Sequence, residues 1–172
     1  AVSYKNSEEI ILKNFENFKI KIYTKVNRNN FNTFSKNIKK YKNQIECIYF
    51  HNLSDYLDKN FKQKVLNFKK KNKIKKIGVS IYPTDKYLKI LKFKDLDIVQ
   101  LPLNILDRTF LDNGFIKKLK KRRIEVHVRS IFFQGLFAMK FTKMQLKFPF
   151  LAKQLAKIRL ITSQIVLSKS NI

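Results

Sequence analysis

Short apolar runs recur along this chain at nearly even spacing, and a segment with helical periodicity separates each pair of runs. The clearest pair is Ile77–Ser80 (IGVS) and Ile98–Leu101 (IVQL). Between these runs, Tyr87, Leu88 and Leu91 recur at the spacing of one helix face. A short apolar run predicts a buried strand, and apolar residues three or four positions apart predict a helix. This part of the chain is therefore predicted to form a strand, a helix and a second strand.

The same alternation extends over most of the chain. Five strands are predicted, at residues 19–25, 46–51, 74–80, 97–101 and 124–129. Helices are predicted at residues 7–18, 29–43 and 57–68, from residue 83 onward, and around residues 116–119 and 148–160. Regular alternation of this kind predicts a parallel sheet, which is either doubly wound or closed into a barrel. A doubly wound dinucleotide fold carries G-x-G-x-x-G after its first strand, and this sequence lacks that motif. A (β/α)8 barrel needs eight strands, of which five are predicted here.

Polar motifs follow the predicted strands in a particular order. Ile77–Ser80 is followed by D-x-V-Q at Asp97–Gln100, by N-x-L-D-R at Asn104–Arg108 and by S-x-x-x-Q-G at Ser130–Gly135. This order resembles the central part of the aldo-keto reductase superfamily. The members of that superfamily transfer hydride between a nicotinamide dinucleotide and a carbonyl or alcohol.

The resemblance implies an α/β fold, a (β/α)8 TIM barrel, that is incomplete in this chain, with about five of eight strands. The sequence opens with AVSY, as if it began inside the family motif D-T-A-x-x-Y, and residues 162–172 resemble the helix that leads into the eighth strand. Residues 1–172 are accordingly expected to form a single barrel domain, truncated at both ends, that covers roughly strands three to seven. Because five strands leave two sheet edges exposed, this stretch alone is expected to be inactive.

Three residues match the catalytic positions of the family. Tyr4 stands at the tyrosine of D-T-A-x-x-Y, Lys25 closes one predicted strand and His51 closes the next. Hydride reduction of a carbonyl leaves an alkoxide that needs a proton, so an acid must lie beside the carbonyl oxygen. The resemblance implies that Tyr4 donates this proton, that Lys25 lowers the pKa of the phenol, and that His51 orients the carbonyl.

The resemblance also implies NADP or NAD as cofactor, and the family residues that distinguish the two have no counterpart in this sequence. Ser80 and Gln100 match positions that hydrogen-bond the nicotinamide carboxamide. Arg129 stands where the family has an aromatic ring under the nicotinamide, and its planar guanidinium is expected to stack there instead. A buried amide for Gln100 and an ion-paired strand end for Arg129 are the alternatives. The loop under the pyrophosphate matches Ser130, Phe132, Gln134 and Gly135. Ile81 and Ile131 replace the asparagine and proline that are usual in the family.

The net charge of +26 comes from 38 Lys and Arg against 12 Asp and Glu, and it suggests a polyanion as partner. The basic residues are nevertheless spread along the chain, whereas nucleic-acid-binding proteins favour clustered arginines interleaved with aromatic residues. The densest basic run, Lys117–Arg123, is predicted to be the solvated end of a helix. We therefore expect no specific nucleic-acid partner.

The single cysteine, Cys47, lies inside an apolar run, where a buried and unreactive thiol is expected. One cysteine excludes a disulfide framework within the chain and fits a reducing compartment. The longest nearly apolar stretch, Ile131–Met139, is too short to span a bilayer, and no charged-then-apolar leader opens the sequence. A cytoplasmic location without a membrane partner is therefore expected.

Taken with the resemblance, these patterns predict an NAD(P)-dependent oxidoreductase that reduces the carbonyl of a small aldehyde, ketone or sugar to an alcohol. The sequence has no cysteine or histidine cluster with metal spacing, no P-loop and no G-x-S-x-G, so no metal is expected. Two alternatives stay open. Ile81 and Arg129 suggest a barrel that binds nucleotide without catalysis, and the net charge suggests a basic polyanion-binding protein.

Overall fold

The computed structural model describes residues 10, 14, 18, 20–38, 44–132, 135–136, 139–151, 153–158 and 160. The chain divides into two compact units, Ala1–Arg129 and Ser130–Ile172. Each unit is described by itself below. The predicted helix over residues 7–18 lies mostly outside the described residues.

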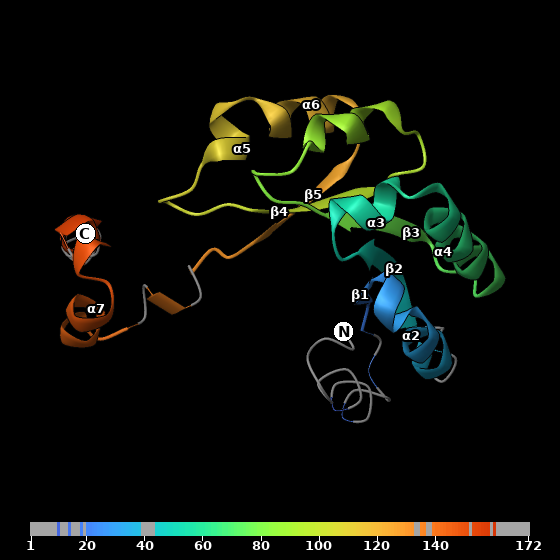
Figure 1. The fold of residues 1–172 in the computed structure, drawn as a ribbon, viewed down its shortest axis with the longest axis horizontal. Coiled ribbons are helices and arrows are strands. Elements are labelled where there is room, and N and C mark those ends of the chain that lie inside the picture. Colours follow the sequence, from blue (N-terminus) through green and yellow to red (C-terminus); the bar gives the residue numbers. More distant parts are fainter. Residues whose placement is uncertain are drawn as a thin grey trace. The chain divides into compact units, whose positions relative to one another are not determined.

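The first unit is an α/β structure built on a parallel sheet whose five strands lie side by side in chain order (Figure 1). The strands are β1 (Ile22–Val26), β2 (Ile45–Phe50), β3 (Lys76–Ser80), β4 (Ile98–Pro102) and β5 (Glu125–Arg129). Each of them overlaps a strand predicted from the sequence. Among these described strands the order never reverses, whereas a doubly wound sheet reverses at its switch point.

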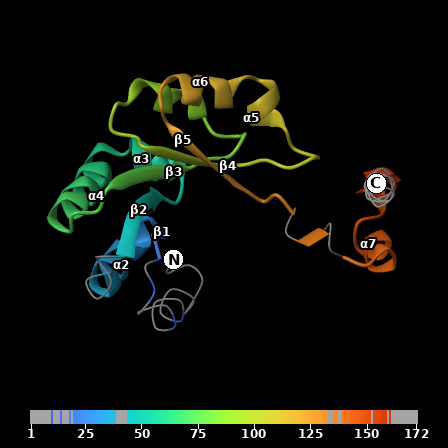
Figure 2. The same ribbon diagram turned by 180° about the vertical axis from the view of Figure 1, so that it is seen from behind.

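Helical segments connect the strands. They are η2 (Arg28–Asn30), α2 (Phe31–Ile38), α3 (Leu53–Leu57), α4 (Lys59–Lys71), η4 (Tyr87–Lys92), α5 (Thr109–Asp112) and α6 (Phe115–Lys121). Connections between parallel strands are nearly always right-handed, so a sheet that adds strands in one direction carries its helices on one face. Figures 1 and 2 show α4 and α6 along this face of the sheet.

The main hydrophobic core lies between the sheet and the helices. One residue of each strand meets its neighbours in register on this face, in the order Val26, Phe50, Val79, Val99 and Val126. Helix residues pack against this row, among them Phe34, Phe61, Val65, Phe115 and Leu119. Burying each large apolar side chain contributes about 1.5–3 kcal/mol, so this face supplies most of the driving force for folding.

The segment between β3 and β4 differs from the prediction. It is a 3₁₀ helix that begins at Tyr87, not an α-helix that begins near residue 83. A 3₁₀ helix has three residues per turn, so Tyr87 and Ile90 lie on the same side. Ile90 is fully buried, whereas Leu88 is 54% exposed. The predicted stripe was therefore wrong for Leu88.

The sheet curves strongly toward the face opposite the helices. β1 and β5 are its two outer strands, and in a flat sheet they would lie about 19 Å apart, at about 4.8 Å per strand. The ring of Tyr23 on β1 nevertheless lies 5.1 Å from the ring of His127 on β5. Tyr49 on β2 lies close to both rings. Side chains from the two outer strands therefore meet across this face.

The second unit contains α7 (Phe141–Lys147), a helix that is absent from the elements predicted above. Residues 149–151 and 153–158 are also helical, which confirms much of the helical segment predicted at 148–160. Leu136, Met144 and Leu155 form a small core of their own. Within the parts of the chain that the structure describes, none of the helices has the length and apolar character needed to span a bilayer.

Candidate active site

Alternate residues of the five strands point away from the helices, and we call the surface that they form the polar face. Its members are Tyr23, Lys25, Cys47, Tyr49, His51, Lys76, Gly78, Ser80, Ile98, Gln100, Glu125, His127 and Arg129. The five site residues that were predicted before residue 130 and that the structure describes all belong to it, and they lie at or near the carboxyl ends of their strands. They are Lys25, His51, Ser80, Gln100 and Arg129.

Lys25 lies on β1, in register with Tyr49 of β2. Burial, followed by the positive charge of Arg129, lowers the pKa of its ammonium group from 10.5 to about 8. Arg129 belongs to β5, at the other side of the sheet, so the curvature brings these two cations close enough to repel each other. Near neutral pH the lysine still carries its charge, but it holds its proton less tightly than a lysine in water does.

His51 follows β2 directly, and its backbone N–H donates a hydrogen bond to the carbonyl of Val26 at 2.8 Å. Burial lowers the pKa of the imidazole, and the charges of Lys25 and Arg129 lower it further, whereas Asp55 acts in the opposite direction. A histidine with a lowered pKa is neutral at pH 7 and presents one N–H donor and one acceptor.

Arg129 extends from the end of β5 past β4 to the end of β3. Its Nη2 donates to the carbonyl of Ile81 at 3.2 Å, and its guanidinium carbon lies 4.1 Å from the centre of the Tyr82 ring. A guanidinium that is held along one edge and against one aromatic face has few orientations left. Tyr82 was not predicted as a site residue, because no strand pattern links it to β5.

Ser80 and Gln100 are paired in register on β3 and β4, and the Ser80 hydroxyl donates to Gln100 Oε1 at 3.4 Å. A primary amide beside a hydroxyl matches the donor and acceptor pattern of a carboxamide. The carboxamide-binding role that the resemblance implies for these two residues stays a prediction. Ile81, which follows Ser80 directly, is fully buried in the core.

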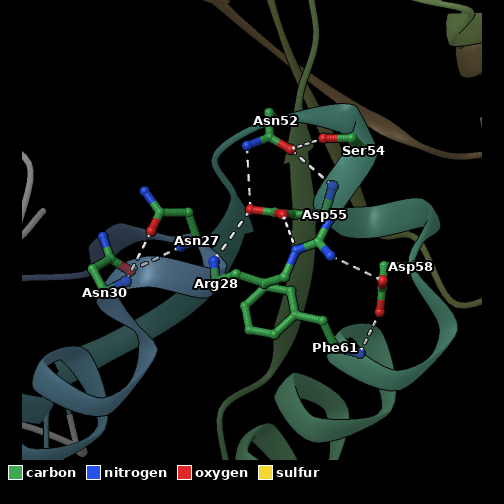
Figure 3. Close-up of polar contacts among 8 residues, drawn as sticks. All are labelled: Asn27, Arg28, Asn30, Asn52, Ser54, Asp55, Asp58 and Phe61. Atoms are coloured by element: carbon green, nitrogen blue, oxygen red, sulfur yellow. Dashed lines mark hydrogen bonds and ion pairs between the residues drawn. The ribbon is translucent and has the colours of Figure 1, made fainter.

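An ion pair ties the loop after β1 to the loop after β2 (Figure 3). Arg28 Nε lies 2.9 Å from Asp55 Oδ1, and Arg28 Nη1 lies 3.1 Å from Asp58 Oδ2. The backbone N–H of Arg28 also donates to Asp55. Lys25 precedes Arg28 by three residues and His51 precedes Asp55 by four, so these contacts hold the two strand ends that carry the predicted catalytic residues.

The same loops begin the helices that follow β2. The Asn52 side chain accepts a hydrogen bond from the backbone N–H of Asp55 at 2.8 Å and caps α3. The Asp58 side chain accepts from the backbone N–H of Phe61 at 2.7 Å and caps α4. Asparagine and aspartate are favoured at this position because their side chains accept a hydrogen bond from an N–H of the first helical turn that has no partner within the helix. Asp55 is buried, and its action on His51 could not be read from the sequence.

A separate cluster on the polar face contains Lys76 and Glu125, the first residues of β3 and β5, together with Tyr49 of β2 and His127 of β5. The Tyr49 hydroxyl lies 2.7 Å from His127 Nδ1, His127 Nε2 lies 2.9 Å from Glu125, and Lys76 Nζ lies 2.6 Å from Glu125. Burial raises the pKa of the Tyr49 phenol, so it stays protonated and donates to His127. Nε2–H of the imidazole then donates to the Glu125 carboxylate. The Tyr49 ring lies directly over Gly78.

The remaining predicted residues lie either outside the described residues or in the second unit. Tyr4 and Gln134 lie outside the described residues. Ser130, Phe132 and Gly135 belong to the second unit, where Ser130 and Gly135 have φ angles of 61° and 85° and Phe132 is 70% exposed. Positive φ at a serine is uncommon and marks a sharp turn directly after β5.

The donor atoms of this site suit hydrogen bonding and charge stabilisation. Across the described residues, histidine, cysteine, aspartate and glutamate side chains form no group of three that would hold a metal ion. Cys47 is buried, as predicted, and burial raises the pKa of its thiol, which makes it a poor nucleophile. The chain matches no known protein-family model, and a search of curated proteins finds no match either.

Proposed function

We propose that this protein is an NAD(P)-dependent oxidoreductase of the aldo-keto reductase type, which reduces a carbonyl group to an alcohol. The observation that carries the proposal is the convergence of Lys25, His51 and Arg129. They come from β1, β2 and β5, and each takes part in the electrostatic coupling that lowers the pKa values of Lys25 and His51. Barrel enzymes place their chemistry at this carboxyl end of a parallel sheet.

We further propose that the five strands belong to a (β/α)8 barrel. Three features support this proposal: the strands follow chain order, the helices pack on one face, and Tyr23 on β1 approaches His127 on β5. A sheet with this order and curvature closes on itself when further strands are added at its edges.

Reduction adds two electrons and one hydrogen to the carbonyl carbon and one proton to the oxygen. The bound nicotinamide supplies the hydride, and the protein has to supply the proton. In this proposal Tyr4 donates its phenolic proton to the oxygen, and the Lys25 ammonium stabilises the tyrosinate that remains. Neutral His51 donates an N–H to the same oxygen and fixes its position. Solvent then returns the proton to Tyr4.

Four residues are proposed to hold the nicotinamide. Ser80 and Gln100 would bind its carboxamide through the hydroxyl and amide described above. Arg129 and Tyr82 form a stacked pair at the same end of the sheet, and this pair takes the place of the aromatic ring that the family has. A planar guanidinium and an aromatic ring both present flat surfaces against which a ring can stack.

The proposal is tested by titrating the full-length protein with NADPH and with NADH while following the fluorescence of the reduced nicotinamide. Saturable binding of either one, followed by its carbonyl-dependent oxidation, is expected. Lys25→Met should abolish oxidation, and Lys21→Met, which changes an exposed lysine just before β1, should not. Absence of saturable binding to both nucleotides at millimolar concentration contradicts the proposal.

A catalytically idle nucleotide-binding barrel is the second candidate. The observation that favours it is the apolar, buried Ile81, which has no polar group to offer at a position where aldo-keto reductases have asparagine. An idle barrel would bind NADPH without oxidising it against any carbonyl. In such a protein Lys25→Met would leave every measured property unchanged except stability.

A further inference from the structure

Positive charge is concentrated where the chain enters β3, β4 and β5. Three segments lead into the amino-terminal ends of these strands, and we call them together the basic edge. They are residues 69–76, 92–97 and 120–125. These segments contain twelve Lys and Arg residues against three Asp and Glu residues.

The opposite end of the sheet has no such excess. Four loops leave the carboxyl ends of β1, β2, β3 and β4, and they are residues 27–30, 51–58, 81–86 and 103–108. Together they contain three Lys and Arg residues against four Asp and Glu residues. A composition that is merely rich in lysine would load both ends alike. The asymmetry is therefore a property of how this fold distributes its charges.

Hydrogen bonds join the three segments of the basic edge to one another. Arg122 Nη2 donates to the carbonyl of Phe93 at 3.3 Å. The backbone N–H of Glu125 donates to the carbonyl of Asp97 at 2.9 Å, and the backbone N–H of Ile77 donates to Asp97 Oδ2 at 2.8 Å. The segments before β3, β4 and β5 thus form one continuous surface at the amino-terminal ends of the strands.

The three acidic residues of the basic edge already have partners. Asp95 Oδ2 lies 2.7 Å from Lys62 Nζ, and Glu125 Oε2 lies 2.6 Å from Lys76 Nζ. Asp97 accepts the N–H of Ile77, as described above. These carboxylates are therefore engaged elsewhere than with the outermost cations of the surface.

Most cations of the basic edge are exposed to solvent. Within the ranges that the structure describes, ion pairs to the exposed cations Lys70, Lys71, Lys73, Lys92, Lys94, Lys120, Lys121 and Arg123 are absent. Like charges on one surface repel one another, and this repulsion is relieved when an anion with many charges binds.

Two of these cations occupy positions that favour glycine. Lys73 and Arg123 have φ angles of 56° and 58°, and each follows the end of a helix and precedes a buried isoleucine, Ile74 or Ile124. A side chain raises the free energy of this left-handed conformation, which glycine adopts readily. The helix dipole favours cations only in the last turn of a helix, and both residues lie beyond it. A cation is thus kept twice at a conformational cost, as is typical of residues that bind a ligand.

We propose that the basic edge binds the phosphate backbone of a nucleic-acid duplex without reading its base sequence. A duplex carries one negative charge per about 1.7 Å of its axis, which suits a continuous row of cations. The exposed large apolar side chains among the described residues all lie outside the basic edge. The surface therefore offers no side chain to insert into a membrane or to stack on single-stranded bases. This site lies at the other end of the strands from the proposed active site and does not rest on the proposed function.

The test measures binding of the full-length protein to a short, fluorescently labelled DNA duplex by fluorescence anisotropy. We expect a dissociation constant of about 1–100 μM, and log K should fall linearly with log[NaCl] between about 50 and 200 mM. Duplexes of different base sequence, and an RNA duplex, should bind comparably, whereas single-stranded DNA should bind less tightly. Affinity that does not depend on salt, or a preference for the single strand, overturns the proposal.

A triple variant assigns the binding to the basic edge. Lys73→Gln, Lys121→Gln and Arg123→Gln together should weaken duplex binding about tenfold or more at about 100 mM NaCl, because three phosphate contacts are lost. The slope of log K against log[NaCl] should become shallower by about two to three. Unchanged affinity in this variant contradicts the proposal.

The control triple carries the same change of charge at the other end of the sheet. It combines Lys59→Gln, Lys86→Gln and Arg108→Gln, which alter exposed residues at or after the carboxyl ends of the strands. Since the net charge falls equally in both triples, attraction by net charge alone predicts equal losses. The control is expected to lose less than about threefold in affinity. Equal losses in the two triples overturn the basic edge as the binding surface.

A glycine variant separates binding from folding. Lys73→Gly and Arg123→Gly together remove two cations and relieve two left-handed side chains, so urea unfolding should need at least as much denaturant as for the wild type. Duplex binding should nevertheless weaken, with a slope that is shallower by about two. A glycine variant that binds the duplex as tightly as the wild type contradicts the proposal.

An anionic membrane is the competing polyanion, and vesicles of phosphatidylserine and phosphatidylcholine are the probe for it. The vesicles should bind less tightly than the duplex. Vesicles that bind more tightly, and that lose this affinity in the basic-edge triple, would overturn the nucleic-acid partner. NADPH binding should be the same in the basic-edge triple and the wild type, so the proposed oxidoreductase and the basic edge fail separately.

Discussion

The polar face carries two clusters. The first contains Lys76 and Glu125, which are the first residues of β3 and β5, together with His127 from the middle of β5. The second contains Lys25, His51 and Arg129, which lie at or next to the carboxyl ends of β1, β2 and β5. In the first cluster, cation, carboxylate and imidazole contact one another directly, and Tyr49 completes the chain. In the second, two cations lie near a histidine whose pKa they lower.

The contrast between the two clusters distinguishes charges that stabilise the fold from charges for which we propose a chemical role. Charges that serve only the fold are expected to attract one another, because repulsion in a partly buried place costs free energy. The first cluster satisfies this expectation. The second keeps a repulsive arrangement, and such an arrangement is typical of sites that bind a ligand of opposite charge. We therefore assign stability to the first cluster and propose chemistry for the second.

Lys25→Met gives the largest expected effect. Carbonyl reduction should fall by about 10²-fold or more, which is the scale of a lost acid-base component. Unfolding at pH 7 should nevertheless require more denaturant, because the variant removes a repelled and partly buried charge. The readouts are turnover and urea unfolding, compared with Lys21→Met. A loss of both activity and stability would mean that Lys25 is structural.

The sign of this stability effect follows from the lowered pKa. The folded chain binds the Lys25 proton less tightly than the unfolded chain does, with a pKa of about 8 against 10.5. The penalty is complete below pH 8 and vanishes above pH 10.5. The free energy of unfolding of the wild type should therefore rise, relative to that of Lys25→Met, as the pH increases across this window. A stability difference that does not change between these pH values contradicts the lowered pKa.

Gly78→Ala tests the packing of the first cluster. A Cβ at this position would run into the Tyr49 ring and would lie 3.2 Å from the Ile98 carbonyl oxygen. The ring would have to move away from His127, and the free energy of unfolding should fall by about 1–3 kcal/mol, as for other overpacked cores. Urea unfolding measures this fall, and Thr84→Ala, at an exposed position, is the control. An unchanged unfolding midpoint in Gly78→Ala would show that this packing is loose.

Arg28→Met loosens the loops that carry the second cluster. The variant leaves the Asp55 carboxylate, whose side chain is 6% exposed, without its main cation. Because the Arg28 side chain is itself about half exposed, the loss of stability should be about 1–2 kcal/mol. Arg108→Met, which breaks an exposed pair with Asp112, should change stability by less than about 0.5 kcal/mol. Equal losses of stability in the two variants would show that the contact between Arg28 and Asp55 matters no more than an exposed ion pair.

Glu125→Gln gives the smallest expected effect. Hydrogen bonds from Lys76 and His127 lower the pKa of the Glu125 carboxyl. A lowered acid pKa stabilises the fold above the ordinary value of 4.5, and this contribution is lost as the pH falls below it. Since these side chains are partly exposed, the variant should cost at most about 1 kcal/mol at pH 7 and leave turnover intact. If turnover fell by more than the loss of stability explains, Glu125 would have to be assigned to the active site.

The five strands could be predicted from the sequence. Each contains apolar side chains for the core, and a polar side chain indicates where it ends. The sequence was also sufficient to place Lys25, His51, Ser80, Gln100 and Arg129 at the same end of a parallel sheet. The helix α7 was missed although Phe141, Met144 and Phe148 recur at the spacing of one helix face. The 3₁₀ geometry of η4 was missed because short apolar segments fit more than one helical period.

Contacts that depend on the curvature of the sheet could not be predicted. His127 and Tyr49 are separated by 78 residues, and their hydrogen bond requires β5 to turn toward β2. The stacking of Arg129 on Tyr82 and the repulsion between Arg129 and Lys25 have the same origin. Strand periodicity gives the face on which a residue lies, but the distance between residues of separate strands follows from how far the whole sheet bends.

The most direct test of the division between the two clusters is to measure urea unfolding and NADPH-dependent carbonyl reduction on Lys25→Met and Glu125→Gln side by side. We predict opposite outcomes: Lys25→Met is more stable than wild type and inactive, and Glu125→Gln is slightly less stable and active. Loss of stability in Lys25→Met together with loss of turnover in Glu125→Gln would contradict this division, because the chemistry would then belong to the first cluster.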